Sequence, residues 1–169
     1  MTADFELTAL RPEYGVTGFD CGHASLDRWL RDSALRAQHQ GSARVWVMTA
    51  PGDVRVLGYF ATAPTTVERV DLSGRQAGGL TLVPVFLIGK LAVDRSVQGR
   101  GLGANLLRKA LENVCAAAAA GGGRIVVVDA IDERAAGFYA KYGFTPIRGS
   151  RRLVMLVADI EGALGRSRR

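Results

Sequence analysis

The sequence predicts a mixed α/β fold in which helices cover the faces of a β-sheet. Strand-like and helix-like segments alternate along the chain in the order β, α, β, β, β, α, β, α, β, β. The segments PVFLIGKLAV and RIVVVDA are nearly continuous apolar runs, which is typical of strands near the middle of a sheet. The segment SLDRWLRDSALRAQHQ instead places its apolar and small residues at the spacing of one helical face.

The first half of the chain is expected to hold a strand, a helix and a β-hairpin. Ser25 is the expected cap of the helix, because its hydroxyl can accept a hydrogen bond from the first helical turn. The turn PGD separates two strand-like segments, which indicates a hairpin. The glycine-rich residues 73–79 are expected to form a loop between strands. The strand-like segments are DFELTAL, RVWVMTA and VRVLGYFATAPTTV.

The second half of the chain predicts two more helices. The segment GLGANLLRKALENVCAAAAA is expected to be a long helix that ends at three glycines. The segment DERAAGFYAKYG is expected to be a shorter helix, with Asp132 as its cap and Gly143 at its end. Two closing strands are expected in FTPIR and RRLVMLVADI.

Length and composition favour one globular domain. The chain has 169 residues, of which 48% are hydrophobic and 22% are charged, as in an ordinary globular protein. We expect residues 1–160 to form a single domain and residues 161–169 to form a basic, flexible tail. No run approaches the roughly 20 apolar residues of a membrane helix, and the N-terminus lacks the plan of a signal peptide. A cytoplasmic protein without membrane contact is therefore expected.

The charge of the chain favours an anionic partner. The formal net charge is +6, and only Lys90, Lys109 and Lys141 among the cationic residues are lysines. Arginine suits phosphate because its planar fork donates two hydrogen bonds at once. A genome rich in Arg, Ala and Gly codons is an equally good explanation of the surplus. The two cysteines, Cys21 and Cys115, lie near no histidine cluster, so neither a metal site nor a disulfide framework is predicted.

The stretch AVDRSVQGRGLGANLL joins an apolar strand to an apolar helix through a basic, glycine-rich turn. It lacks the GxxxxGK(S/T) pattern of a P-loop. The dinucleotide pattern GxGxxA is matched by Gly99, Gly101 and Ala104. Residues 113–128, however, hold none of the acidic residues that a dinucleotide site needs there. Backbone N–H groups at a helix N-terminus, with Arg95 and Arg100 beside them, still favour an anion. The alternative is a turn that binds nothing.

Two motifs carry a resemblance to a known family. The residues QGRGLG, from Gln98 to Gly103, resemble the Q/R-x-x-G-x-G/A motif of the GNAT family of N-acetyltransferases. The residues FYAKYGF, from Phe138 to Phe144, are similar to the FYxxxGF motif of the same family. The order of elements is similar from end to end. The resemblance implies the GNAT acyl-CoA N-acyltransferase fold, a mixed and mostly antiparallel central sheet flanked by helices.

The resemblance implies a site for acetyl-CoA. The turn is expected to hold the pyrophosphate through the backbone N–H groups of residues 99–104. Strands four and five are expected to splay into a V, where Leu91–Val93 part from Ile125–Val128 and the pantetheine arm can bind like an added strand. The expected cofactor contacts are Leu91, Ala92, Val93, Gln98, Gly99, Arg100, Gly101, Leu102, Gly103, Ala104, Phe138 and Tyr142.

The same resemblance implies catalytic roles for two residues. Tyr139 matches the family's tyrosine, whose hydroxyl serves as the general acid toward the leaving thiolate. The backbone N–H of Val93 is expected to meet the oxyanion. Taken by spacing alone, Tyr139 belongs with Phe138 and Tyr142 to a packed aromatic stripe. Possible bases, none of them singled out by spacing, are Glu68, Asp94, Asp129 and Glu133.

Further segments resemble one branch of the family. Phe19-Asp20-Cys21-Gly22, followed by SLDRWL, resembles the opening of toxins from GNAT-type toxin–antitoxin pairs. The segments GYFATAP, GKLAVDRSVQGRGLG and DAIDERAAGFYAKYGF are similar to the same toxins, so the resemblance covers residues 19–158. It implies acetylation of the α-amine of aminoacyl-tRNA and inhibition of translation. It also implies a ribbon-helix-helix antitoxin as partner and a homodimer.

The α-amine of an aminoacyl ester is less basic than a lysine amine, so a strong protein base is not required. Arg28, Arg31 and Arg36 on the first helix are expected to face the antitoxin or solvent. Candidate tRNA contacts are Arg95, Arg100, Arg148, Arg151 and Arg152. An acetyltransferase that acts on a small-molecule or protein amine is the alternative with the same fold. A regulator or RNA-binding module without turnover is the non-enzymatic alternative.

Overall fold

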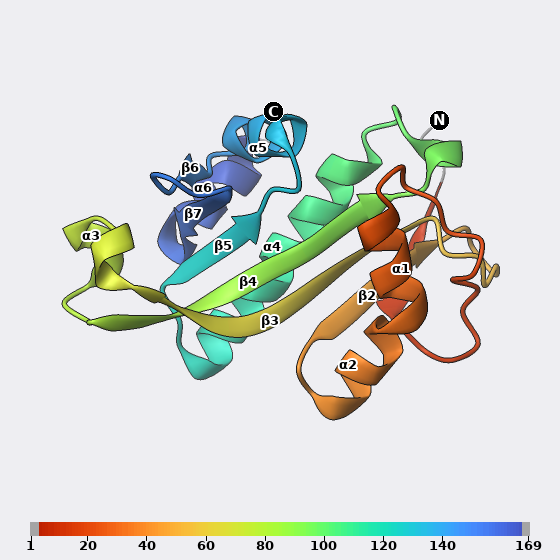
Figure 1. Ribbon diagram of the computed structural model, residues 1–169, viewed down its shortest axis with the longest axis horizontal. Coiled ribbons are helices and arrows are strands. Elements are labelled where there is room, and N and C mark those ends of the chain that lie inside the picture. Colours follow the sequence, from red (N-terminus) through yellow and green to blue (C-terminus); the bar gives the residue numbers. More distant parts are fainter. Residues whose placement is uncertain (1–3, 167–169) are drawn as a thin grey trace. The chain divides into compact units, whose positions relative to one another are not determined.

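The structure is a computed structural model that describes residues 4–166 (Figure 1). The strands are β1 (Glu6–Ala9), β2 (Arg44–Thr49), β3 (Gly58–Glu68), β4 (Leu82–Val93), β5 (Ile125–Asp129), β6 (Thr145–Pro146) and β7 (Arg152–Leu156). The α-helices are α1 (Ala24–Asp32), α2 (Ala34–Gln40), α3 (Gly74–Ala77), α4 (Leu102–Gly121), α5 (Glu133–Lys141) and α6 (Val157–Arg166). Short 3₁₀ helices span Arg69–Asp71 and Arg95–Val97.

The strands follow the hydrogen-bonded order β1-β2-β3-β4-β5-β7-β6 in a 7-stranded sheet. The pairs β1–β2, β2–β3, β5–β7 and β6–β7 are antiparallel, whereas β4 and β5 are parallel. The predicted mixed, mostly antiparallel sheet with flanking helices is therefore confirmed.

The chain divides into two compact units. The first unit holds the described residues up to Ala63 together with Lys90–Lys109. The second holds Pro64–Gly89 together with the described residues from Ala110 onward. Strands β3 and β4 and helix α4 each contribute residues to both units. The single domain expected for residues 1–160 stays a prediction.

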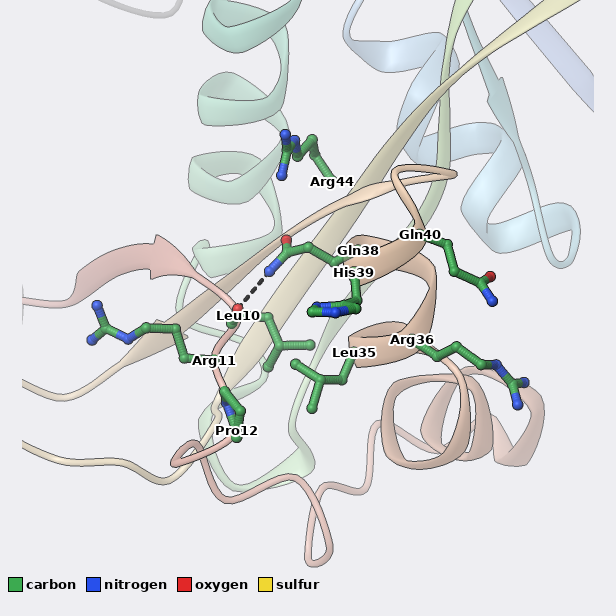
Figure 2. A pocket seen from close by; sticks show the side chains of 9 residues that line it. All are labelled: Leu10, Arg11, Pro12, Leu35, Arg36, Gln38, His39, Gln40 and Arg44. Atoms are coloured by element: carbon green, nitrogen blue, oxygen red, sulfur yellow. Dashed lines mark hydrogen bonds between the residues drawn. The ribbon is translucent and has the colours of Figure 1, made fainter.

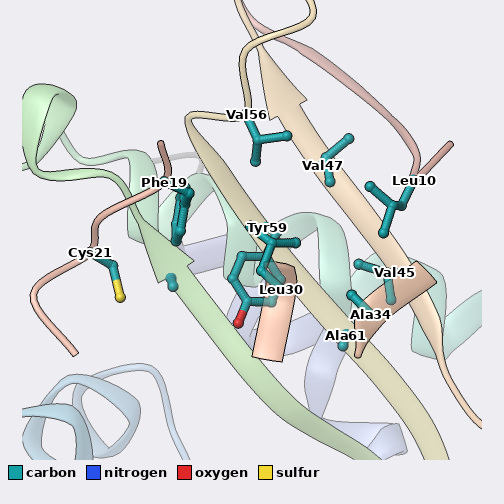
Figure 3. Packing of buried hydrophobic residues seen from close by; sticks show 11 residues of the cluster. Leu10, Phe19, Cys21, Leu30, Ala34, Val45, Val47, Val56, Tyr59 and Ala61 are labelled. Carbon is teal, nitrogen blue, oxygen red and sulfur yellow. The ribbon is translucent and has the colours of Figure 1, made fainter. Parts of the chain in front are cut away.

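In the first unit, α1 and α2 pack on one face of the sheet. Successive side chains of a strand point to opposite faces, so alternate residues such as Val45 of β2 line this face. Leu30 of α1 and Ala34 of α2 are fully buried against Val45 and Tyr59 (Figure 3). The hydroxyl of Tyr59 donates a hydrogen bond of 2.8 Å to the carbonyl of Leu26. The aromatic ring therefore fills this core without leaving its hydroxyl unsatisfied.

In the second unit, a separate core forms on β4, β5 and β7. Val85, Ile125, Val127 and Val154 are buried on one face of these strands, together with Ala77 of α3.

The prediction of a loop at residues 73–79 is wrong, because helix α3 lies within this segment. The Ser73 hydroxyl accepts the N–H of Gln76 at 3.2 Å, and the Gln76 side chain accepts the N–H of Ser73 at 2.9 Å. This reciprocal cap stabilises a single helical turn, and the composition of the segment concealed it.

The helix expected over residues 25–40 is two helices. The prediction that Ser25 caps it is wrong, because α1 begins at Ala24 and Ser25 lies inside its first turn. The two helices are separated at Ser33, whose backbone lies outside the helical region. The backbone carbonyl of Ser33 still accepts a hydrogen bond from the N–H of Ala37 at 2.9 Å. The spacing of apolar residues in the sequence did not reveal this break, because Leu30 of α1 and Ala34 of α2 are buried in the same core.

The last strand is shorter than expected. β7 ends at Leu156, and the residues from Val157 onward form α6, so the prediction of a strand to Ile160 is wrong. Ile160 is fully buried, which fits a helix that packs one face. Helix α6 also includes residues 161–166 of the expected tail, and residues 167–169 lie outside the described part of the chain. The cap expected at Asp132 is confirmed, because its carboxylate accepts the N–H of Ala135 at 2.8 Å.

The register of β4 and β5 bears on the expected splay. It runs from the pair Val85–Ile125 to the pair Ile88–Val128. β5 ends at Asp129, whereas β4 continues to Val93. The residues of β5 thus pair with the middle of β4, and Leu91–Val93 lie past the end of this register.

Candidate active site

The turn between β4 and α4 is built to present backbone N–H groups. Gly99 and Gly101 have φ angles of 78° and 76°, a left-handed conformation that glycine adopts without strain. Asn105 donates its N–H to the carbonyl of Gly101 at 3.3 Å, at the start of α4. The N–H groups of the first helical turn have no intrahelical acceptor, and the helix dipole adds positive potential there. This geometry suits an anion such as a pyrophosphate.

A buried carboxylate, that of Asp94, organises the start of this turn. The residue is 3% exposed. One oxygen accepts the N–H of Asp20 at 3.0 Å, and the other accepts the N–H and the hydroxyl of Ser96 at 3.0 and 2.7 Å. The Arg55 guanidinium lies 3.5 Å away. Burial alone would raise the pKa of Asp94, but these donors and the arginine together lower it.

These contacts favour a structural role for Asp94 over the role of a base, which the sequence also allowed. A carboxylate with a lowered pKa is a weak proton acceptor, and both of its oxygens accept hydrogen bonds. The sequence does hold a signal for the structural role, since an Asp two residues before a Ser after a strand favours a side-chain capped turn.

Gln98 uses its side chain inside the protein. Its amide nitrogen donates to the carbonyl of Cys21 at 2.9 Å and to the carbonyl of Val93 at 2.8 Å. The residue immediately before Gly99 is therefore fixed on two sides. The side-chain amide of Gln98 already donates to two carbonyls within the protein. Any role of Gln98 toward the cofactor therefore depends on its backbone or on these two hydrogen bonds.

The direction of the Val93 N–H follows from the strand. In a sheet, the N–H groups of successive residues point to opposite neighbours. The N–H of Asp94 donates to Leu57 at 2.8 Å, on the side of β3. The N–H of Val93 therefore points to the opposite edge of β4. This direction fits the expected oxyanion contact.

Tyr139 lies on α5 in the second unit. Its side chain is 5% exposed. Its ring meets the ring of Phe138 at 5.3 Å and that of Phe144 at 5.8 Å, both edge to face, and Phe138 meets Tyr142 at 5.1 Å. The aromatic stripe is thus real packing. Burial, and then the negative charge of Asp129, raise the pKa of Tyr139. The hydroxyl keeps its proton near neutral pH, as a general acid must.

The candidate tRNA arginines differ in how far they are engaged. Arg152 donates to both carboxylate oxygens of Asp129 at 2.7 and 3.1 Å, and this pair raises the pKa of Arg152. Arg151 donates to the carbonyl of Ile131 at 2.6 Å. Arg95 lies 3.4 Å from the carboxylate of Asp20. The side chains of Arg100 and Arg148 are exposed.

Three of these arginines line a cavity of about 560 Å³ in the second unit. Acidic side chains line it as well, so it offers both signs of charge. Asp129, one of the possible bases, is paired with Arg152 there. The charged residues of this cavity are Arg148, Arg151, Arg152, Glu68, Asp71 and Asp129. Glu133, the remaining possible base, is exposed at the start of α5.

A surface groove of about 730 Å³ lies between α2 and the end of β1. Figure 2 shows Leu10, Pro12, Leu35 and His39 gathered at its centre, with arginines extending outward at its rim. The Gln38 side chain holds the floor by donating to the Leu10 carbonyl at 2.5 Å. The cationic lining residues are Arg11, Arg36 and Arg44, and the lining holds no acidic residue. Arg36, expected to face a partner or solvent, lies here.

Thiol and metal chemistry find no support in the described residues. Burial first, and then a hydrogen bond with Asp27, raise the pKa of the Cys21 thiol to about 12. Burial likewise raises the pKa of Cys115. Within residues 4–166, no cluster of three or more His, Cys, Asp or Glu side chains is arranged to hold a metal ion. No helix in that range is long and apolar enough to span a membrane.

The comparisons with known proteins agree with the geometry of the turn. A model of the acetyltransferase (GNAT) domain matches residues 41–146. A tRNA-acetylating toxin of Mycobacterium tuberculosis (strain ATCC 25618 / H37Rv) is 39% identical over 156 residues, which is 89% of this chain and 90% of the toxin.

Two solved structures of the toxin AtaT are similar as well. AtaT complexed with acetyl-methionyl-tRNAfMet has a TM-score of 0.86 and 28% identity, covering 95% of this chain and 99% of that one. A tyrosine-to-phenylalanine mutant of AtaT, bound to the C-terminus of the antitoxin AtaR and acetyl-CoA, has a TM-score of 0.83 and 28% identity, covering 95% and 98%.

Because the contacts of Asp94 lower its pKa in the folded protein, they are expected to make the free energy of unfolding depend on pH. Asp94→Asn is expected to lower the free energy of unfolding by about 2 kcal/mol near neutral pH, because hydrogen bonds to a buried charge are lost. The folded-state pKa is below the ordinary value of 3.8. The contribution is therefore fully present above that value and disappears as the pH falls through the folded pKa. Urea unfolding at a series of pH values measures the difference between the two proteins.

The exposed Asp32 gives the matched control Asp32→Asn, for which a change within about 0.5 kcal/mol is expected. A stability gap for Asp94→Asn that stays equally large in acid would contradict the ionised role.

The matched domain model spans more than half of the chain, and it covers both the glycine turn and the tyrosine helix. The chain belongs to the GNAT acetyltransferase family.

Proposed function

We propose that the protein transfers the acetyl group of acetyl-CoA to the α-amine of aminoacyl-tRNA and thereby inhibits translation. The observation that carries this proposal is the glycine turn at the start of α4, with Gly99 and Gly101 in left-handed conformations. It lies in a chain that is 39% identical, over nearly all its length, to a tRNA-acetylating toxin. The complex of AtaT with acetyl-methionyl-tRNAfMet supports the same substrate class.

The residues of the turn fit the pyrophosphate of acetyl-CoA. The N–H groups of residues 99–104 donate to its oxygens, and the exposed Arg100 adds a positive charge. The backbone of Leu91–Val93 holds the pantetheine arm in the manner of a neighbouring strand. Phe138 and Tyr142 add apolar contact. Bound acetyl-CoA supplies the reactive thioester.

The reaction needs an oxyanion donor and a proton donor from this chain. As the α-amine forms its bond to the thioester carbonyl, the N–H of Val93 stabilises the negative charge on the carbonyl oxygen. The C–S bond then breaks, and Tyr139 donates the proton that the sulfur takes up. The amine loses its own proton to solvent. No strong base is required, because the α-amine of an ester is weakly basic.

The arginines are proposed to bind the tRNA backbone. Phosphate contacts supply affinity without reading sequence, which fits a net charge of +6. Such contacts make binding strongly salt-dependent. The proposed set is Arg95, Arg100, Arg148, Arg151 and Arg152.

A second acceptor class is favoured by one observation. The cavity of the second unit carries, beside its arginines and the Asp129–Arg152 pair, the carboxylates Glu68 and Asp71, which suit a cationic amine. A GNAT acetyltransferase that acts on a small-molecule or protein amine would use the same acetyl-CoA site. Acetyl transfer to such an amine without any acetylation of charged tRNA would favour this function.

We infer that a ribbon-helix-helix antitoxin neutralises the protein, as a partner in the cytoplasm, and that the protein is a homodimer. The AtaT complex with the C-terminus of AtaR supports an antitoxin tail as the contacting segment. The groove between α2 and β1 suits an acidic, amphipathic tail, because its rim is basic and its floor is apolar. Sedimentation equilibrium measures the dimer.

Tyr139→Phe is expected to lower the rate of acetyl transfer at least 100-fold, because a positioned general acid is lost. In cell-free translation with acetyl-CoA, the unaltered protein stops synthesis and acetyl-aminoacyl-tRNA accumulates. The variant leaves translation running. Tyr14→Phe, which removes a hydroxyl that bonds Thr8, is the matched control and is expected to inhibit fully. Inhibition by Tyr139→Phe at the level of the unaltered protein would contradict the role of the hydroxyl.

Leu35→Glu is expected to weaken capture of the antitoxin about tenfold or more, because it places a charge on the apolar floor of the groove. Leu35 is 41% exposed, so folding is preserved. Leu80→Glu, at a leucine with 45% exposure, is the matched control. Titration of the antitoxin into the translation assay measures neutralisation. Equal neutralisation of both variants and the unaltered protein would exclude the groove as the docking site.

A further inference from the structure

The segment Asp20–Gly22 contacts the glycine turn at several points. The N–H of Asp20 donates to the Asp94 carboxylate at 3.0 Å, and the Asp20 carbonyl accepts the N–H of Arg95 at 2.8 Å. The Cys21 carbonyl accepts the Gln98 amide at 2.9 Å. The Asp20 carboxylate lies 3.4 Å from Nε of Arg95. Segments more than seventy residues apart in sequence are thus joined by hydrogen bonds at both ends of the 3₁₀ turn.

This segment is itself held firmly. The N–H of Cys21 donates to the Asp27 carboxylate at 2.9 Å, which attaches the segment to the start of α1. The N–H of Gly22 donates to the Asp20 carboxylate at 3.0 Å. Phe19, just before it, is 6% exposed and meets Tyr59 edge to face at 5.5 Å. The segment is therefore anchored to α1 and to the core around Tyr59, and it is hydrogen-bonded to the turn at the same time.

Gly22 keeps the segment close to Arg95. Its φ angle is 95°, and a Cβ there would lie 3.4 Å from the Arg95 guanidinium. A side chain at this position is strained by the backbone conformation and crowds the arginine. Gly22 is not one of the expected cofactor contacts, so a change there perturbs the segment and the neighbouring Arg95 without replacing a residue of the acetyl-CoA site.

We propose that Asp20–Gly22 is a positioning element of the acetyl-CoA site, which acts through Asp94 and Gln98 to hold the glycine turn in its anion-binding shape. Asp94 fixes Ser96 at the start of the turn. Gln98, bonded to both Cys21 and Val93, fixes the residue before Gly99. A turn that is already ordered binds a pyrophosphate without a further entropic cost of ordering its N–H groups. Asp94 and Gln98 are therefore positioning residues, and the proposal rests on the pyrophosphate site of the proposed function.

The test separates pyrophosphate binding from the rest of the reaction. Gln98→Met removes both donated hydrogen bonds at nearly unchanged volume, and Gly22→Ala disturbs the segment from outside the turn. Acetyl-CoA affinity is measured by calorimetry. Acetyl transfer is then measured with acetyl-CoA and with acetyl-pantetheine, which lacks the pyrophosphate. Gln40→Met, in an exposed glutamine, and Gly18→Ala, where an added Cβ meets no described atom within 4 Å, are the matched controls.

Both variants are expected to weaken acetyl-CoA binding about tenfold and to raise its KM with little change in kcat. For Gly22→Ala, transfer from acetyl-pantetheine is expected to stay unchanged, since that donor does not use the turn. For Gln98→Met, which also loses the bond to the Val93 carbonyl, it is expected to fall much less than transfer from acetyl-CoA. A general loss of structure would instead lower transfer from both donors in parallel and lower the melting temperature, and this result would overturn the proposal. Affinity for acetyl-CoA unchanged in both variants would overturn it as well. Failure of the unaltered protein to bind acetyl-CoA would instead refute the underlying function.

Discussion

The turn between β4 and α4 depends on one buried carboxylate, that of Asp94. Its two oxygens accept N–H groups from Asp20 and Ser96 and the hydroxyl of Ser96. A buried carboxylate is costly to leave unpaired, so each donor must stay in place for the protein to be stable. The same requirement fixes the backbone on which the glycine turn is built. One set of hydrogen bonds thus stabilises this region and holds the turn that is proposed to bind the pyrophosphate.

The chemistry of the site is carried mainly by backbone groups. In the proposed reaction, the N–H groups at the start of α4 supply positive potential to the charged pyrophosphate, and the N–H of Val93 supplies it where the oxyanion develops. Within the first unit, the Gln98 side chain supports these groups, and in the second unit the buried Tyr139 holds the proton of the proposed general acid. Arg152 is occupied by Asp129. Arg100 and Arg148 are exposed, which favours them over Arg152 as the proposed contacts to a substrate phosphate.

The sequence was sufficient for the elements with strong periodicity or a motif. The apolar runs of β4 and β5, the Asp132 cap and the end of α4 at the triple glycine were all predicted, because each depends on local chemistry. The break at Ser33 and the change from strand to helix at Val157 were missed, since the apolar pattern continues across both. Residues 73–79 were read as a loop because their glycines concealed the Ser73–Gln76 cap.

The roles of Asp94 and of Asp20–Gly22 were beyond the sequence for a physical reason. The local bonds between Asp94 and Ser96 follow from an Asp-x-Ser pattern, but the contacts with Asp20–Gly22 join residues that are far apart along the chain and leave no residue pattern. Asp94 looked like one of several possible bases until its donors were seen.

Hydrogen–deuterium exchange, with and without acetyl-CoA, tests most directly whether this turn holds the pyrophosphate. The amides of residues 99–104 are predicted to gain strong protection when acetyl-CoA is added, because their N–H groups become hydrogen-bonded to phosphate oxygens. Protection confined to other segments, with these amides exchanging as fast as before, would contradict the central claim that the backbone of the glycine turn is the anion site.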